Sequence, residues 1–262
     1  MSGGPGRGAA SLLAMLLLVG GCGGERTAEE ASAGDPVSRA LAADARPAAD
    51  RARDAARRPG EVLAFFGIEP GMTVLDVFSG GGYYTEIAAR IVGPAGRVIA
   101  HNNRVYLDYA ADEIAARYAD GRLANVERIE APVTELAVEP GSVDVALLIL
   151  AYHDIYFRPD DGSWPRIDGP AMLAGIREAL RPGGTLGVAD HAGSEDITTG
   201  EIGRLHRIDE ARLVREIESA GFELAARSDV LRNPDDNRQL PMYHPEVRGR
   251  TDRLVLKFRK PE

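Results

Sequence analysis

Cysteine is almost absent from this chain of 262 residues, which has only Cys22. One cysteine excludes a disulfide framework and a metal cluster held by several thiolates. Aromatic residues are also sparse, at 6%, and acidic residues outnumber basic ones, so the net charge is −9 at pH 7. Such a chain has few cations with which to bind a phosphate backbone, which argues against nucleic acid as a partner. The 44% of apolar residues still suffices for a sizeable hydrophobic core.

An apolar run lies at the amino terminus. Residues 9–19 carry no charge and are followed by Gly20, Gly21 and Cys22. A run of about 11 residues is too short for a membrane span, which needs roughly 20, but has the length of a signal-peptide core. Small residues followed by a cysteine resemble the lipobox of bacterial lipoproteins, in which the cysteine becomes diacylated. We therefore expect a signal peptide over residues 1–21 and lipidation of Cys22.

This amino terminus predicts a location and a division of the chain. We expect export to the cell envelope, as a lipoprotein or periplasmic protein, with the lipid on Cys22 as the only contact with the membrane. An ordinary secretory signal is the alternative, and a cytoplasmic location follows if the signal is not used. Residues 22–50 contain no aromatic residue and are predicted as a flexible tether, and residues 51–262 as one folded domain.

From residue 70 onward, short apolar segments alternate with segments of helical spacing. Strands are predicted at 73–78, 97–100, 126–130, 143–150, 185–189, 222–230 and 253–258, the last two as an antiparallel closing pair. Helices are predicted within 47–66 and at 84–92, 106–118, 170–180 and 207–220. This alternation predicts an α/β fold with a doubly wound, Rossmann-like, mainly parallel sheet of seven strands and an antiparallel closing strand. The functional site of such a sheet lies at the carboxyl ends of its strands.

Three consecutive glycines, Gly80 to Gly82, follow the first predicted strand. Because they lack side chains, they let the backbone approach a ligand, and the helix behind them offers free amide groups. The dinucleotide fingerprint G-x-G-x-x-G would need a glycine at position 85, where Thr85 stands. A nicotinamide dinucleotide is therefore not expected.

The sequence around these glycines resembles motif I of the class I S-adenosylmethionine-dependent methyltransferases. The matching stretch is VLDVFSGGGYYT at 74–85, and PGSVDVA at 140–146 and LRPGGTL at 180–186 resemble the family's approach to strand four and turn into strand five. FFGI at 65–68, HRID at 206–209 and the tail 251–261 resemble a bacterial group of often exported methyltransferases. The resemblance covers about residues 60–260 and implies S-adenosyl-L-methionine as the cofactor.

The resemblance also implies cofactor-binding residues at the ends of the first two strands. They are Asp76, Ser79, Gly80, Gly82 and Asn102. Asn102 stands where the family usually has an acidic residue that holds both ribose hydroxyls, and an amide binds hydroxyls less strongly than a carboxylate.

Two further family positions are altered. Phe78 replaces the first glycine of the loop, and Pro132 replaces the acidic residue that often meets the adenine amino group. Glu130 and Thr134 are nearby substitutes for that acidic residue. We expect the cofactor to bind weakly.

Methyl transfer is an in-line displacement at a sulfonium methyl, so the protein chiefly orients donor and acceptor and excludes water. An acceptor hydroxyl or protonated amine also needs a base near the ends of strands four and five. His153 and Asp154 follow the fourth predicted strand, and His191 follows the fifth. We predict His153 as the base, oriented by Asp154, with His191 as the second candidate. The alternative for each histidine is structural, as a helix cap or a partner of a buried carbonyl.

Other residues on this predicted face could bind a metal or an aromatic acceptor. His153, Asp154, Asp190, His191 and Asp209 are residue types that bind divalent metal, but a site needs them within about 2.0–2.6 Å of one ion, so we assign no metal. The aromatic residues at 83, 84, 152, 156 and 164 are candidates for an acceptor pocket or for the core, and residues 158–167 are predicted as a lid.

The sequence predicts an S-adenosylmethionine-dependent methyltransferase with a small-molecule acceptor. A nucleic-acid acceptor is disfavoured by the charge and by AYHD at 151–154, where an Asn/Asp-Pro-Pro-Tyr-type motif would stand, while protein acceptors stay open. The cofactor is made in the cytoplasm, whereas the leader directs the chain outward. The alternative is therefore a catalytically inactive, envelope-anchored binding protein on a methyltransferase fold. The altered ribose position favours that alternative, and the retained glycine loop and histidines disfavour it.

Overall fold

A computed structural model describes residues 1–4 and 34–262 of the chain. Cys22, most of the predicted signal peptide and the start of the predicted tether lie outside the described residues. Within the described part, no helix is both long enough and apolar enough to cross a membrane.

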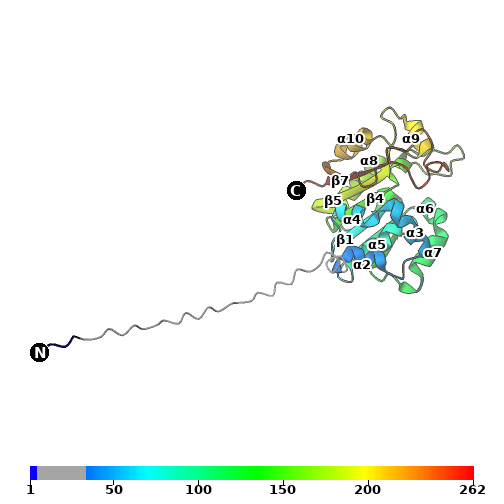
Figure 1. Cartoon of the computed structure of the whole chain (residues 1–262). Helices are drawn as coiled ribbons and strands as arrows, with labels where there is room; N and C mark the ends of the chain where they lie inside the picture. Colours follow the sequence, from blue (N-terminus) through cyan, green and yellow to red (C-terminus); the bar gives the residue numbers. More distant parts are fainter. Residues whose placement is uncertain (5–33) are drawn as a thin grey trace.

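A seven-stranded sheet organises the domain, and helices cover both of its faces (Figure 1). Its strands in spatial order are β3 (Val126–Glu130), β2 (Arg97–Asn102), β1 (Thr73–Val77), β4 (Val143–Ile149), β5 (Leu180–His191), β7 (Arg253–Arg259) and β6 (Glu223–Arg227). Strand β7 pairs antiparallel with β5 and β6, and the other pairs of the described sheet are parallel. The predicted fold class is confirmed.

The helices follow the predicted alternation. They are α2 (Pro36–Ala42), α3 (Ala48–Arg57), α4 (Pro59–Phe66), α5 (Tyr83–Val92), α6 (Arg104–Tyr109), α7 (Ala111–Tyr118), α8 (Gly169–Ala179), α9 (Thr199–Leu205) and α10 (Glu210–Ser219), with short 3-10 helices η1 (Ala119–Gly121), η2 (Val133–Glu135) and η3 (Tyr152–Tyr156). The predicted helix 106–118 divides at Ala110, whose φ and ψ of −109° and 19° are not helical. Helix α9 was not predicted, although Thr198 and Glu201 form a capping box at its start.

Strand β4 is buried on both faces, as its apolar sequence predicts. Val145 and Leu147 belong to a core cluster shared with α4 and α5, whereas Ala146 and Leu148 belong to a second cluster shared with α8 and α10. Because successive side chains of a strand point to opposite faces, the central strand joins two cores. The carboxyl end of β4 is thereby held rigidly at the edge where the site lies.

Residues 36–50 are not a tether, and this part of the predicted division is wrong. They form α2 and the start of α3, and α2 packs against α5. Ala40 and Arg46 are each 2% exposed, and Arg46 makes two hydrogen bonds of 2.7 Å with the carboxylate of Asp54. Burial of an alanine face and of a paired guanidinium orders a segment whose composition alone suggested a solvated linker. The folded domain therefore begins before residue 51.

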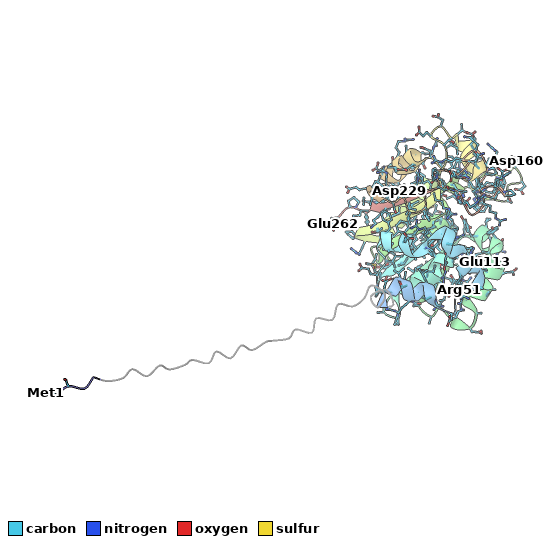
Figure 2. The ribbon with its side chains drawn as sticks, viewed as in Figure 1. Met1, Arg51, Glu113, Asp160, Asp229 and Glu262 are labelled. Atoms are coloured by element: carbon cyan, nitrogen blue, oxygen red, sulfur yellow. The ribbon has the colours of Figure 1, made fainter. Side chains whose placement is uncertain are left out.

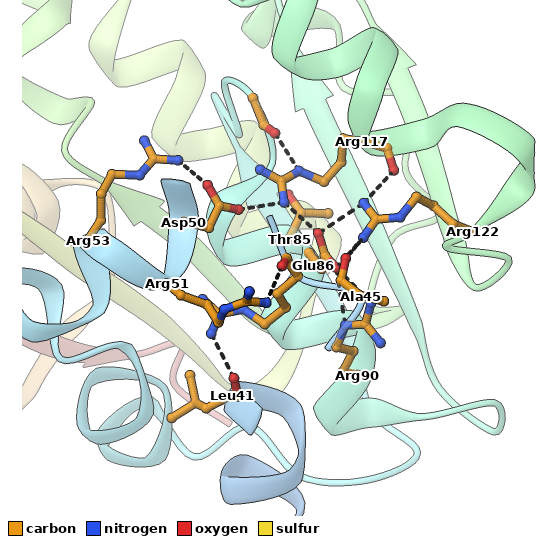
Figure 3. Close-up of polar contacts among 12 residues, drawn as sticks. Leu41, Ala45, Asp50, Arg51, Arg53, Thr85, Glu86, Arg90, Arg117 and Arg122 are labelled. Carbon is orange, nitrogen blue, oxygen red and sulfur yellow. Dashed lines mark hydrogen bonds and ion pairs between the residues drawn. The ribbon is translucent and has the colours of Figure 1, made fainter. Parts of the chain in front are cut away.

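Arg117 links the amino-terminal helices to the rest of the domain (Figure 3). Its Nη1 lies 2.6 Å from Asp50 on α3 and 2.5 Å from Glu86 on α5, and its Nε donates to the Gly81 carbonyl at 2.8 Å. Burial raises the pKa of Glu86, but hydrogen bonds from Arg90 and Arg117 outweigh it and hold this pKa below its usual range. One guanidinium thus binds α3, α5 and the loop that follows β1.

Replacing Arg117 tests this linkage. Arg117→Ala leaves Asp50 and Glu86 buried with fewer cationic partners, so we expect the free energy of unfolding to fall by about 3 kcal/mol in urea denaturation. Arg104→Ala is the control, because Arg104 is 84% exposed and pairs with Asp108 on the same helix. The control should lose less than about 1 kcal/mol. Equal losses in the two variants would contradict the proposed linkage.

Candidate functional site

The glycine loop, residues 79–82, connects β1 to α5 at the carboxyl edge of the sheet. Gly80 and Gly82 have φ values of +55° and +78°, which favour glycine. A Cβ on Gly80 would meet no atom of the described residues within 4 Å. A Cβ on Gly81 would collide with the side chain of Glu113 on α7, labelled in Figure 2. Gly81 is therefore needed for packing, and Gly80 faces space that a ligand can fill.

The polar side chains of this loop have two roles. Asp76 is 3% exposed and accepts a hydrogen bond from Thr85 Oγ1 at 2.6 Å, which fixes the start of α5. Burial raises the pKa of Asp76 to about 6. Ser79 has a buried hydroxyl without a hydrogen-bond partner among the described residues. Because a buried polar group without a partner is costly, Ser79 is the group of the loop that a bound ligand would satisfy.

The side chain of Asn102 binds the loop through both of its polar atoms. Its Oδ1 accepts from the Gly80 amide at 2.9 Å, and its Nδ2 donates to the Gly80 carbonyl at 3.0 Å. Asn102 therefore ties the loop to β2, and its second N–H is not used in these bonds, so its role in binding the ribose stays a prediction. His101 is fully buried beside it, accepts from the Phe78 amide at 3.4 Å and donates through Nε2 to the Ala131 carbonyl at 3.0 Å. Burial lowers the pKa of His101, so it stays neutral.

A cavity of about 510 Å³ lies at the ends of β2 and β3. It is lined by Asn103, Arg104, residues 130–134 and residues 165–168. The set includes Glu130 and Thr134, the predicted substitutes for the family's adenine-binding residue. Asn103, one position after the predicted Asn102, lines it as well. The cavity has the size of a small-molecule site.

Phe78 joins this region to the end of β4. It has a φ of +54°, is 4% exposed, and stacks on Tyr106 with ring centroids 4.9 Å apart. Tyr106 in turn donates to Asp154 Oδ2 at 2.5 Å. The aromatic side chain that replaces a family glycine thus bridges β1 and the residues after β4.

Asp190, at the end of β5, holds the predicted catalytic residues in place. Its Oδ2 accepts from the His153 amide at 2.9 Å, and its Oδ1 accepts from His153 Nδ1 at 2.6 Å and from the His191 amide at 2.7 Å. Both oxygens of Asp190 are thereby occupied by groups of the two neighbouring segments. Asp190 positions His153 and His191, although only Asp154 was predicted as the orienting residue.

Asp154 lies between two imidazoles. Its Oδ1 is 3.3 Å from His153 Nε2 and 3.2 Å from His206 Nδ1. Burial lowers the pKa of His153, but Asp190 and Asp154 outweigh it and raise this pKa to about 9. His153 therefore carries a proton at neutral pH and has both nitrogens occupied. Asp154 contacts His153 as predicted, and the role of His153 as the base stays a prediction.

His191 and His206 differ in what their nitrogens contact. His191 is 4% exposed, its Nδ1 lies 2.7 Å from Thr251 Oγ1, and its Nε2 has no partner among the described residues. Burial is the largest effect on the pKa of His191 and holds it well below its usual range. The His191 side chain is therefore neutral, and it is a weak base. His206 caps α9 with a φ of +51° and has a side chain that is 17% exposed. In the sequence, His206 stood out as part of HRID at 206–209 and was assigned no role. Asp209 was predicted as a residue of a type that binds metal. In the structure its side chain caps the start of α10.

The aromatic residues predicted to line one acceptor pocket lie in separate parts of the domain. Tyr152 and Tyr156 line a second cavity, of about 1340 Å³, and both donate to Glu216 on α10. Tyr83 and Tyr84 lie buried on α5, away from these groups. Trp164 packs edge-on against Tyr106, with ring centroids 5.5 Å apart. It belongs to the predicted lid, whose Asp160 lies at the periphery of the domain in Figure 2.

Sequence comparisons match part of the chain. The family model described as Protein-L-isoaspartate(D-aspartate) O-methyltransferase matches residues 54–127. The Ubiquinone/menaquinone biosynthesis C-methyltransferase UbiE of Ectopseudomonas mendocina (strain ymp) is 28% identical over 121 residues, which are 46% of this chain and 42% of that protein. The match therefore spans less than half the length of this curated relative.

Structure comparisons cover more of the chain. A SAM dependent methyltransferase from Aquifex aeolicus aligns with a TM-score of 0.54 and 20% identity over 77% of this chain and 89% of that one. The Haemonchus contortus Phosphoethanolamine N-methyltransferase 2, in complex with S-adenosyl-L-methionine, aligns with a TM-score of 0.52 and 16% identity over 79% of this chain and 53% of that one. At sequence identities of 20% and 16%, the structural similarity establishes the fold alone. The chain therefore has the Rossmann-like fold of these methyltransferases, and its match to a methyltransferase family model covers residues 54–127.

The left-handed backbone at Phe78 predicts which of two substitutions at this position gives the more stable protein. Both Phe78→Gly and Phe78→Ala lose a buried ring, but only alanine keeps the strain of a side chain at positive φ. We expect Phe78→Gly to be the more stable of the two by about 1 kcal/mol in urea denaturation, the reverse of the usual order. An alanine variant as stable as the glycine variant would contradict strain at this position.

Proposed function

We propose that this protein transfers a methyl group from S-adenosyl-L-methionine to a small-molecule acceptor. The observation that carries the proposal is the glycine loop, which is open at Gly80 and holds the unpartnered hydroxyl of Ser79. The 510 Å³ cavity at the ends of β2 and β3 and the histidine and carboxylate groups after β4 and β5 lie at the same edge of the sheet as the loop.

The residues present fit the cofactor at the loop. Gly80 leaves room for it, Ser79 can bond to it, and Asn102 and Arg117 hold the loop from its two sides. Glu130 and Thr134 offer oxygen atoms in the cavity at the ends of β2 and β3. When bound, S-adenosyl-L-methionine supplies a sulfonium methyl that an acceptor nucleophile displaces.

The groups after β4 and β5 suit the acceptor side of this reaction. Hydrogen bonds and the charges of His153 and His206 outweigh burial and hold the pKa of Asp154 below its usual range, so it stays ionised. An ionised carboxylate of this kind orients an acceptor hydroxyl or amine. The 510 Å³ cavity has a volume suited to a small ligand, which favours a small-molecule acceptor over a macromolecule.

Calorimetric titration of S-adenosyl-L-methionine and S-adenosylhomocysteine into the full-length protein tests the cofactor site. We expect binding in the micromolar range that Gly80→Arg weakens at least 100-fold, because the new side chain fills the open space. Gly141→Arg is the matched control, since Gly141 has a φ of +69°, an equally open Cβ direction and a position ahead of β4, at the opposite end of the sheet. It should bind the cofactor as the wild type does.

Two results would contradict the proposal. Equal binding by the wild type and Gly80→Arg would mean that the ligand lies elsewhere, and absence of binding at millimolar ligand would remove the cofactor. The second result would favour the alternative of a catalytically inactive, envelope-anchored binding protein, because a shared fold does not fix a shared activity.

We further propose that residues 1–21 direct export and that Cys22 carries a lipid. The apolar run and the small residues before Cys22 support this proposal. A fusion of residues 1–30 to a reporter that works only after export should be active, and Cys22→Ser should abolish incorporation of a labelled fatty acid. An inactive reporter would instead support action in the cytoplasm, where the cofactor is made.

A further inference from the structure

Three side chains near the end of β4 have the separations of a metal site. They are His153, Asp154 and His206, whose ligand atoms all lie within 4.8 Å of one another. Asp154 Oδ1 is 3.3 Å from His153 Nε2 and 3.2 Å from His206 Nδ1. Two ligand atoms bound at 2.0–2.2 Å to one tetrahedral ion are roughly 3.3–3.6 Å apart. The two measured distances are therefore close to those that an ion would set.

Two of these three atoms are oriented by a partner on the other side of their group. Asp190 accepts a hydrogen bond from His153 Nδ1, which directs Nε2 toward Asp154. Tyr106 donates to Asp154 Oδ2, which leaves Oδ1 between the two imidazoles. Carboxylates that bond the far nitrogen of a histidine are the usual supports of metal ligands, because they fix the ring and its tautomer.

The surroundings also suit an ion. His153 and Asp154 are 2% and 7% exposed, whereas the side chain of His206 is 17% exposed and gives access from solvent. His206 holds its position with a φ of +51°, a strained conformation of the kind found at functional sites. The ring of His191, with its unpartnered and buried Nε2, lies 5.8 Å from that of His153.

We propose that this cluster binds one divalent first-row transition-metal ion through His153 Nε2, Asp154 Oδ1 and His206 Nδ1. Two imidazoles and one carboxylate favour such an ion over magnesium or calcium, which prefer oxygen ligands. The ion takes the place of the hydrogens that His153 Nε2 and His206 Nδ1 direct toward Asp154 Oδ1. The hydrogen of His153 Nε2 is released to solvent on binding, and His206 binds through the tautomer that carries its hydrogen on Nε2. Three protein ligands leave a coordination position open for an acceptor oxygen or water.

Titration of Co²⁺ and Zn²⁺ into chelator-treated, full-length protein tests the site, by calorimetry and by the visible absorption of Co²⁺. We expect one ion per chain and a Kd in the micromolar range or tighter. His206→Asn should weaken binding at least 100-fold, and asparagine tolerates the left-handed backbone at this position. Asp190→Asn should weaken it about 10- to 100-fold, because the support of His153 is lost.

His244→Asn is the matched control. His244 is the histidine outside this face of the sheet, and its Nδ1 accepts only from the Glu246 amide. The control should bind one ion with wild-type affinity, and circular dichroism confirms that each variant is folded. No binding by the wild type, or equal binding by His206→Asn, overturns the proposal. Cofactor titration in the presence of a chelator separates this outcome from the proposed function, because the glycine loop contains no ligand of the ion.

Discussion

The carboxylate of Asp190 is the constraint on which the site depends. It lies at the end of β5 and binds the backbone and the ring of His153, which belongs to the segment after β4. Because two parallel strands end side by side, one carboxylate can fix the residues that follow both of them. The orientation of His153, and through it the position of Asp154, follows from this interaction. The site is thus built on strand ends that the core holds rigidly.

The cofactor loop is fixed in a comparable way, by groups that are remote in sequence. Asn102 binds both backbone groups of Gly80, and Arg117 binds the Gly81 carbonyl. Arg117 also pairs with Asp50, so the amino-terminal helix α3 supports the loop. Asn102, placed at a family ribose position, therefore serves the shape of the loop, and Ser79 is left as the polar side chain free to meet a ligand.

Much of the fold could be predicted because its pattern is local. The strands at Val126–Glu130 and near Arg253–Arg259 were predicted closely, since alternating or continuous apolar residues report burial directly. Residues 36–50 were predicted wrongly because alanine, proline and charged residues resemble a linker when their partners are unknown. Arg46 and Asp50 are ordered by partners at Asp54 and Arg117, and such pairing cannot be recognised from composition.

The sequence by itself determined the fold, the position of the glycine loop and the gathering of histidines at one edge of the sheet, because these depend on periodicity and strand order. The tertiary structure decided what each polar side chain does. It placed His153 between two carboxylates, used Asn102 for the loop, and brought His206 from the end of α9 to Asp154. Those roles depend on distances of a few ångströms between segments far apart in the chain, which no local pattern specifies.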